Sequence, residues 1–395
     1  MLDRSDPLEL RARDQKLTPL TDRSASDLRR VLRVAALALT AACSHRYPDA
    51  RALAELVQPL PDLPAVPLRC LVANHVHTIV SDRYSHDPRP QQAAWAYSPR
   101  GLHDAIAAFQ RDGVAAIVLT DHNAIDANFD PQVARAPIAV IPGMEWTTRR
   151  GHALLIGFAA VDRNDAILPP PWRSATTRAD FQAMVDRTHA RGGLVIIAHP
   201  RVPLRTWPDD SFGADGVEVW GLDLALMRNG AAQRWWHERL VGGERLLAIA
   251  GTDLHPGATI RRHRHPLNWV YAARCDPTAI LAAIRAGHLL VVRDAHAPQV
   301  LLGLETGGAL DFADAREGDS LALTGPTVDV QLRVLAGAGA TLTVLGRAGL
   351  LHTRPIATAD ELVRLRLRAA PGDFIRAELR SGRQLLALTN PVYLR

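Results

Sequence analysis

Short apolar segments recur through the middle of the chain, histidine or an acidic residue follows most of them within a few positions, and helix-type segments separate several of them. The apolar segments span residues 69–74, 114–119, 139–141, 194–198, 216–220 and 246–250. This alternation predicts an α/β fold with a parallel sheet, and in a closed parallel barrel the carboxyl ends of all strands meet at one face. The sequence therefore predicts that polar residues far apart in the chain converge at one mouth.

The residues that directly follow these segments are of the types that bind metals. In chain order the candidate ligands are His75, His77, Asp82, His122, Glu145, His152, His199, Asp253 and His255. Imidazole and carboxylate groups suit zinc, iron and manganese, and no thiolate is among the candidates. His75 and His77 stand two residues apart, so both side chains point to one side of an extended chain. We interpret the set as a metal cluster rather than as a structural core, because so many converging histidines would repel one another on protonation.

Short motifs surround these ligands. They are His-x-His-Thr with Ser-Asp at 75–82, Thr-Asp-His-Asn at 120–123, Pro-Gly-x-Glu at 142–145, Gly-His at 151–152, Ala-His-Pro at 198–200 and Gly-Thr-Asp-x-His at 251–255. In this order the chain resembles the PHP family, the polymerase and histidinol phosphatase superfamily of metal-dependent hydrolases, over roughly residues 68–295. The resemblance implies a distorted (β/α)7 barrel of TIM-like architecture with a trinuclear metal site.

The resemblance also implies a role for each candidate ligand. The implied sets are His75, His77 and Asp253 for the first metal, Glu145 as the bridge to the second, His152 and His199 for the second, and Asp82, His122 and His255 for the third. Arg83 stands where the family has a glycine, and Ala73-Asn74 replace its common Asp-Leu, but neither departure removes a ligand. The expected cofactors are three divalent ions, either zinc, manganese or iron.

The expected reaction is hydrolysis by a metal-bridging hydroxide, with Glu145 and Asp253 as catalytic residues. Metals about 3.5–4 Å apart lower the pKa of a shared water. We expect a phosphoesterase that acts on a small organic phosphate. The alternative is a carboxyl- or carbamate-ester hydrolase with the same site, because the ending 389–393 resembles the branch that contains carbaryl hydrolases. A non-enzymatic binding module fits the intact ligand set less well.

Residues near the ligands are candidates for supporting roles. Arg83, His86 and Arg201 are candidate substrate contacts, although solvated loop residues or a surface salt bridge explain them as well. We expect Asp121 to orient His122, and Glu218 to support a ligand from outside the cluster.

Charge and cysteine content exclude other classes. The net charge is +5, but Lys16 is the only lysine and the arginines are scattered, whereas a nucleic-acid binder would cluster them. No apolar run reaches about eighteen residues, so we expect no transmembrane span. Three cysteines are too few for a disulfide framework, and we interpret Cys70 and Cys275 as isolated, small buried residues.

The expected domain organisation has five parts. They are a disordered leader or misassigned start at 1–28, a lipoprotein-type signal at 29–43, a linker at 44–67, the barrel at 68–295 and an antiparallel β-sandwich at 296–395. Acylation at Cys43 would anchor the chain in the cell envelope or periplasm. The alternative is a cytoplasmic protein in which 29–43 is an amphipathic or buried helix. The sandwich offers a surface for packing, recognition or formation of a homo-oligomer.

Overall fold

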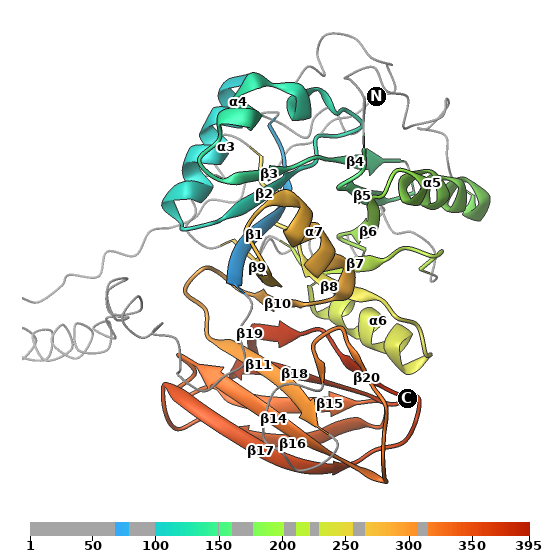
Figure 1. Ribbon diagram of the computed structural model, residues 1–395, viewed down its shortest axis with the longest axis vertical. Helices are drawn as coiled ribbons and strands as arrows, with labels where there is room; N and C mark the ends of the chain where they lie inside the picture. The colour runs from blue at the N-terminus through green and yellow to red at the C-terminus, as the bar shows by residue number, and fades with distance from the viewer. Residues whose placement is uncertain are drawn as a thin grey trace, which may run out of the picture. The chain divides into compact units, whose positions relative to one another are not determined.

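Strands that carry the candidate ligands lie in two sheets of the computed structural model, which describes residues 68–78, 99–148, 150–159, 177–200, 211–221, 229–255, 265–305 and 315–395. One sheet contains the parallel strands β1 (Leu68–Val76), β2 (Ala116–Leu119) and β3 (Ala139–Ile141). The other has, in spatial order, β4 (Gly143–Thr147), β5 (His152–Ile156), β6 (Leu194–Ala198), β7 (Gly216–Trp220) and β8 (Leu247–Ala250). The predicted apolar segments are therefore strands, as expected (Figure 1).

Both sheets are mixed, so the prediction of a purely parallel sheet was wrong. Strand β5 runs antiparallel to both β4 and β6, and β9 (Leu267–Ala272) runs antiparallel to β1. Residues 148–151 connect β4 to β5, and a connection this short can join only antiparallel neighbours. Within it, the Thr148 N–H donates to the Gly151 carbonyl at 3.1 Å. The Pro-Gly-x-Glu and Gly-His motifs thus lie on one hairpin.

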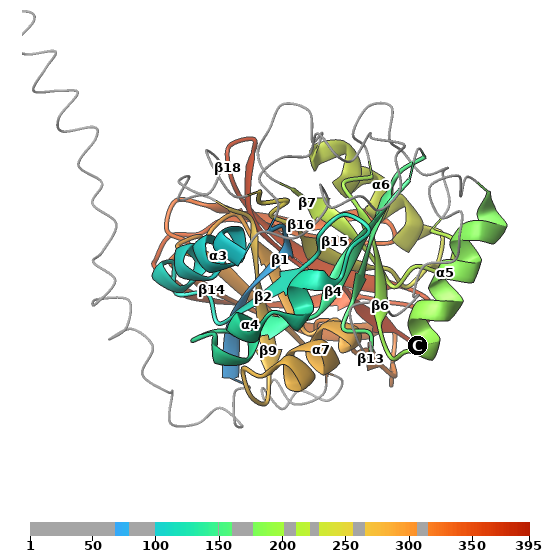
Figure 2. The ribbon, with the colours of Figure 1, turned by 90° about the horizontal axis from the view of Figure 1, so that it is seen from above.

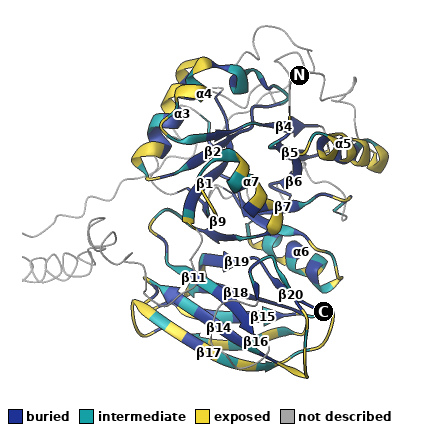
Figure 3. Ribbon diagram, in the orientation of Figure 1, coloured by how far each residue is buried: buried dark blue, intermediate teal, exposed yellow. Residues whose placement is uncertain are grey.

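Helices lie around the outside of these strands, as the view from above shows (Figure 2). Among the described residues they are α3 (Pro99–Arg111), α4 (Pro131–Arg135), α5 (Arg178–Ala190), α6 (Asn229–Val241) and α7 (Pro277–Ala286), and a 3-10 turn spans Asp126–Phe129. Thr177 and Asp180 form a capping box at the start of α5, and Asp276 caps α7. Helix α7 ends at Gly287, whose φ of 79° is unfavourable for other residues. The outer faces of α3 and α5 are exposed, whereas the strands beneath them are buried (Figure 3).

The C-terminal part consists mainly of antiparallel strands, as the period-two pattern predicts, and only the short pair of β13 (Ser320–Leu321) and β20 (Val392–Leu394) among its described strands is parallel. Strand β10 (Leu289–Val292) joins β9 to β19 (Gln384–Thr389), so the sheet of β1 continues into this part. The same sheet, which has 11 strands among the described residues, also contains β13, β15 (Thr341–Gly346), β16 (Gly349–Pro355), β18 (Phe374–Ser381) and β20. A third sheet, which lies wholly in the C-terminal part, has the order β12 (Ala315–Arg316), β11 (Gln299–Glu305), β14 (Thr327–Leu335) and β17 (Asp360–Arg368). Val330 and Leu332 of this sheet share a core with Val344 and Leu379 of the larger one.

A disulfide joins Cys70 and Cys275, so the interpretation of these cysteines as isolated residues was wrong. The two residues are separated by 205 positions, and no local sequence pattern relates them. Cys70 lies near the start of β1, and Cys275 follows the antiparallel strand β9. Because the backbone pairs Leu68 with Ala272, the disulfide crosslinks two strand ends that are already neighbours.

The two sheets meet near the candidate ligands. One isolated bridge joins Val76 to Leu254, and another joins His122 to Glu145. The buried Asn268 side chain on β9 bonds both the N–H and the carbonyl of Ala250 on β8, at 2.8 and 3.0 Å. No continuous hydrogen-bonded ladder joins the described strands of the two sheets. The isolated bridges and the Asn268 side chain link them instead. Among the described residues, no helix combines the length and the apolar character that crossing a bilayer requires.

Candidate metal centre

Three of the candidate ligands have a left-handed backbone, which is rare outside glycine. The φ angles are 64° at His75, 27° at His199 and 46° at Asp253. All three residues lie at or just beyond the ends of β1, β6 and β8. Such conformations cost free energy and tend to cluster where a site requires them. The backbone therefore marks the same three strand ends that the sequence singles out.

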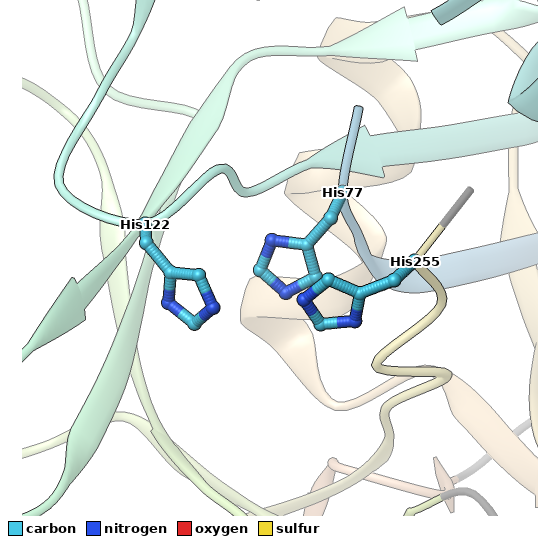
Figure 4. A group of neighbouring side chains, drawn as sticks. All are labelled: His77, His122 and His255. Carbon is cyan, nitrogen blue, oxygen red and sulfur yellow. The ribbon is translucent and has the colours of Figure 1, made fainter. Parts of the chain in front are cut away.

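His77, His122 and His255 form one group of side chains at these strand ends (Figure 4). The His77 ring stacks on the His255 ring at a centroid distance of 4.1 Å and on the His122 ring at 4.6 Å. One ring nitrogen from each residue lies within 4.8 Å of the others, which is close enough for a shared metal ion. His77 and His122 are buried, and His255 is partly exposed.

Three further groups have the same compact arrangement of ligand atoms. They are His75 with His77 and Asp253, His75 with Glu145 and His199, and His122 with Glu145 and His152. All predicted ligands except Asp82 thus come together in the structure. Asp82 lies outside the described residues, as do the candidate substrate contacts Arg83, His86 and Arg201.

Glu145 lies at the centre of the groups, and its two carboxylate oxygens face different histidines. Oε1 lies 2.7 Å from His152 Nδ1 and 3.1 Å from His199 Nε2. Oε2 lies 2.6 Å from His122 Nδ1 and 3.6 Å from His77 Nε2. One side chain of β4 therefore contacts histidines that β1, β2, β5 and β6 supply.

The histidines around the carboxylates keep them ionised. Burial opposes ionisation of Glu145, but His122, His152 and His75 outweigh it and hold the pKa of Glu145 well below its usual value. The pKa of Asp253 is also held well below its usual value, because His75 and His77 outweigh the effect of burial. Two anionic carboxylates among imidazoles are a donor set that suits a hard or borderline divalent cation.

Two imidazoles of the cluster are held in the form that binds metals. Burial and the neighbouring His255 and His122 hold the pKa of His77 well below its usual value. Burial likewise lowers the pKa of His152, to about 4. Metal ligation requires the unprotonated ring, so the environment of His77 and His152 favours it. At His75 and His199, neighbouring carboxylates outweigh the effect of burial and raise the pKa instead.

Several buried ring nitrogens have no hydrogen-bond partner among the described residues. They are Nε2 of His75, both ring nitrogens of His77, Nε2 of His122 and Nδ1 of His199. A buried polar atom without a partner costs about 1–3 kcal/mol. A metal ion supplies the missing partner to such a nitrogen, so the residues of the cluster fit divalent metals.

Two neighbours of the cluster differ from the sequence prediction. Asp121 was expected to orient His122, but its carboxylate accepts from the N–H and the hydroxyl of Thr78, at 2.7 and 2.6 Å. His122 Nδ1 instead lies 2.7 Å from Thr147 Oγ1. Thr147 follows Glu145 by two residues on β4, and this contact depends on the bridge between His122 and Glu145, which the sequence pattern did not reveal.

Comparison with known proteins gives distant structural neighbours. No family model and no curated protein matches the chain. A two-domain protein from Bacteroides vulgatus, described as containing a predicted PHP-like metal-dependent phosphoesterase, is similar with a TM-score of 0.44 and 15% identity, over 85% of this chain and 98% of the other. An amidohydrolase from Chromobacterium violaceum with bound sulfate and no metal has a TM-score of 0.32 and 17% identity, over 48% of this chain and 90% of the other.

Proposed function

We propose that the chain is a metal-dependent hydrolase that acts on a small organic phosphate ester. The observation that carries the proposal is the position of Glu145, whose two oxygens face separate histidine groups in a buried cluster. A carboxylate in that position is suited to bridge two cations. The unpartnered ring nitrogens around it support the same conclusion.

The proposed ligand sets are those that the family resemblance implies. His75, His77 and Asp253 would hold one divalent cation, and Glu145 with His152 and His199 would hold a second. His122, His255 and Asp82 would complete a third position. The grouping of His75 with His77 and Asp253, and of His77 with His122 and His255, supports these sets. Bound divalent cations lower the pKa of water and stabilise the charge that develops on the ester during hydrolysis.

Asp253 and Glu145 have different proposed tasks because their exposure differs. The Asp253 side chain is 18% exposed, whereas that of Glu145 is fully buried. Asp253 therefore faces the solvent side of the cluster, and its ionised carboxylate accepts the proton of the attacking water. Glu145 stays ionised and holds the surrounding histidines in place.

Hydrolysis assays of purified protein supplied with Mn²⁺ or Zn²⁺ test the proposal. We expect turnover of p-nitrophenyl phosphate, and loss of that turnover in both His75→Ala and Glu145→Ala. His103→Ala is the matched control, because this side chain on α3 is 71% exposed and distant in sequence from every ligand. Activity that survives in both ligand variants would exclude the proposed site.

A carboxyl- or carbamate-ester hydrolase is the second candidate. It rests on the resemblance of residues 389–393 to the branch that contains carbaryl hydrolases. Turnover of 1-naphthyl acetate or 1-naphthyl methylcarbamate without turnover of p-nitrophenyl phosphate would select this candidate. The same ligand variants would be inactive in either case.

We also propose that the two sheets form one distorted (β/α)7 barrel over residues 68–295, followed by a sandwich domain over 296–395. The bridges Val76–Leu254 and His122–Glu145 support closure, because they join the sheets at two separate places. The side chain of Asn268 supports it further, since it occupies the position of a backbone partner for Ala250.

Export to an oxidising compartment is a further proposal. Cys43, the expected acylation site, lies outside the described residues. The disulfide between Cys70 and Cys275 supports export, because disulfides persist mainly outside the cytosol. Fractionation of the expressing cells tests it. We expect the protein in the membrane fraction, with release by Cys43→Ala, and recovery of wild type in the cytosol would contradict the proposal.

A further inference from the structure

Glu218 is a buried carboxylate beside the cluster that belongs to none of the proposed ligand sets. It lies on β7, and only 2% of the residue is exposed. Neighbouring strand β6 leads to His199, and the neighbouring strand β8 leads to Asp253. A buried carboxylate needs partners that compensate for its desolvation, and the partners of Glu218 are two of the candidate ligands.

Each oxygen of Glu218 contacts a different candidate ligand. Oε1 lies 2.8 Å from His75 Nδ1, and Oε2 accepts the backbone N–H of His199 at 2.7 Å. The contact with Glu218 therefore engages Nδ1 of the His75 ring and leaves Nε2 as the ring nitrogen available to a metal. His75 Nε2 lies 3.4 Å from both Glu145 Oε1 and Asp253 Oδ1, which places this nitrogen toward the cluster.

The contact with His199 acts on the backbone. His199 has a φ of 27°, a conformation that a residue with a side chain adopts at a cost. A charge-assisted hydrogen bond from its N–H to Glu218 helps to stabilise that conformation. One carboxylate thus fixes the ring of His75 and the backbone of His199, which come from opposite sheets.

Gly251 provides the space that Glu218 occupies. A Cβ atom at position 251 would lie 1.8 Å from Glu218 Oε1 and 2.4 Å from its carboxyl carbon. The backbone of Gly251 is not left-handed, so an alanine could adopt its conformation, and only the contact with Glu218 opposes the substitution. The missing side chain at Gly251, the first residue of the Gly-Thr-Asp-x-His motif, therefore leaves room for the Glu218 carboxylate.

We propose that Glu218 and Gly251 form a positioning pair that sets the tautomer of His75 and the backbone of His199 for metal binding. The inference rests on the proposed function, because it concerns the same cluster. Glu218 would act through its two neighbours, without contact to the substrate. Partners of this kind typically contribute 10–100-fold in metal affinity.

Calorimetric titration of the chelator-treated protein with Mn²⁺ tests the inference. We expect Glu218→Ala to weaken binding by about 10–100-fold. Glu218→Gln should also weaken it, since one amide oxygen cannot accept both hydrogen bonds. Gly251→Ala should reproduce the loss without any change of charge. Glu317→Gln is the matched control for a buried carboxyl. Glu317 is 2% exposed, follows β12 in the C-terminal part and accepts the Leu302 N–H, outside the cluster.

The double variant distinguishes positioning from general destabilisation. In Glu218→Ala the obstacle to a Cβ at 251 is gone, so adding Gly251→Ala should change Mn²⁺ affinity by less than about twofold. A visible absorption spectrum of the Co²⁺-loaded protein reports ligand geometry independently of activity, and we expect it to change in Glu218→Gln. Far-UV circular dichroism of the metal-free variants identifies any that fail to fold, and Gly251→Ala and Glu218→Gln then carry the test.

The outcomes separate the inference from the proposed function. Wild-type affinity and an unaltered Co²⁺ spectrum in folded Glu218→Gln and Gly251→Ala would overturn the positioning pair alone. Fully additive losses in the double variant would also overturn it. A wild-type protein that binds neither Mn²⁺ nor Co²⁺ would overturn the proposed function, and the positioning pair with it.

Discussion

Two buried charged clusters in this protein differ in whether their polar atoms have partners. In the candidate metal centre, ring nitrogens of His75, His77, His122 and His199 lack a hydrogen-bond partner within the described part of the chain. In the C-terminal part, Arg376 and Glu378 on β18 are similarly buried, at 4% and 6% exposure. Their charged atoms, however, are closely paired.

The C-terminal cluster is internally satisfied. Arg376 donates to Glu378 Oε1 at 2.7 Å, and Arg380 donates to Oε2 at 2.8 Å. The Arg376 guanidinium also lies over the Trp236 ring of α6, 4.9 Å from its centroid. Burial opposes ionisation of Glu378, but Arg376 and Arg380 outweigh it and hold the pKa of Glu378 below its usual value.

The difference separates a structural cluster from a candidate binding site. A buried ion pair whose partners match needs no further ligand, and it holds elements together. A group of imidazoles and carboxylates that leaves ring nitrogens unpaired is stabilised by a cation. Variants in the first cluster should therefore change stability, whereas variants in the second should change metal binding and activity.

Glu145→Gln should have the largest effect on activity. Because Gln keeps the shape of the side chain but removes its charge, we expect kcat to fall by about a thousandfold, and the stabilisation by added Mn²⁺ to disappear. In wild type, Mn²⁺ at a concentration a thousandfold above its Kd should raise the free energy of unfolding by about 4 kcal/mol. Thermal unfolding with and without Mn²⁺, together with the hydrolysis assay, measures both effects. A variant that is still stabilised by Mn²⁺ would show that Glu145 is dispensable for the site.

Arg376→Ala should have the largest effect on stability. Its loss leaves Glu378 buried without its main partner, so we expect the free energy of unfolding to fall by about 3–5 kcal/mol. The activity per folded molecule should remain, and chemical denaturation and the assay measure the two quantities. A stable Arg376→Ala protein without activity would reverse the contrast between the two clusters.

Glu317→Gln should change how stability depends on pH. Burial raises the pKa of Glu317 to about 7, from a reference value of 4.5. Between these values the folded chain retains a proton that the unfolded chain has lost, so wild-type stability falls as pH rises from about 4.5 to 7. The variant lacks this contribution and should be more stable than wild type by up to about 3 kcal/mol at pH 8, with no gain at pH 4. Unfolding in the presence of a chelator measures the difference, and parallel pH profiles would contradict it.

Arg366→Ala should have the smallest effect. Arg366 pairs with Asp329 across β14 and β17, but its side chain is 68% exposed. Solvent screens such a pair, and we expect an unfolding free energy close to that of wild type. A loss as large as that of Arg376→Ala would show that burial does not explain the contrast.

The candidate ligands could be predicted from sequence because they follow strands at characteristic spacings. His75, His77, His199 and Asp253 are examples, and the structure brings them together as expected. A short apolar run followed by a histidine can be identified from a few consecutive residues, and it predicts a ligand at the end of a strand. The identity and number of the metals stay predictions.

Other features could not be predicted because they depend on pairings distant in sequence. The bridge between His122, beyond the end of β2, and Glu145 on β4 puts Thr147 beside His122, and neither residue belongs to a pattern that indicates this contact. The disulfide joins residues 205 positions apart. Glu218 was expected to support a ligand, but its contacts with His75 and His199 depend on the order of strands β6, β7 and β8.

Elemental analysis of the purified protein tests the central claim most directly. We predict two to three equivalents of a divalent transition metal per chain in wild type, and less than one equivalent in Glu145→Gln. Arg376→Ala, purified in parallel and still folded, should retain the wild-type metal content. A wild-type protein that carries no metal after purification, and gains none on incubation with Mn²⁺, Zn²⁺ or Fe²⁺, would contradict the account.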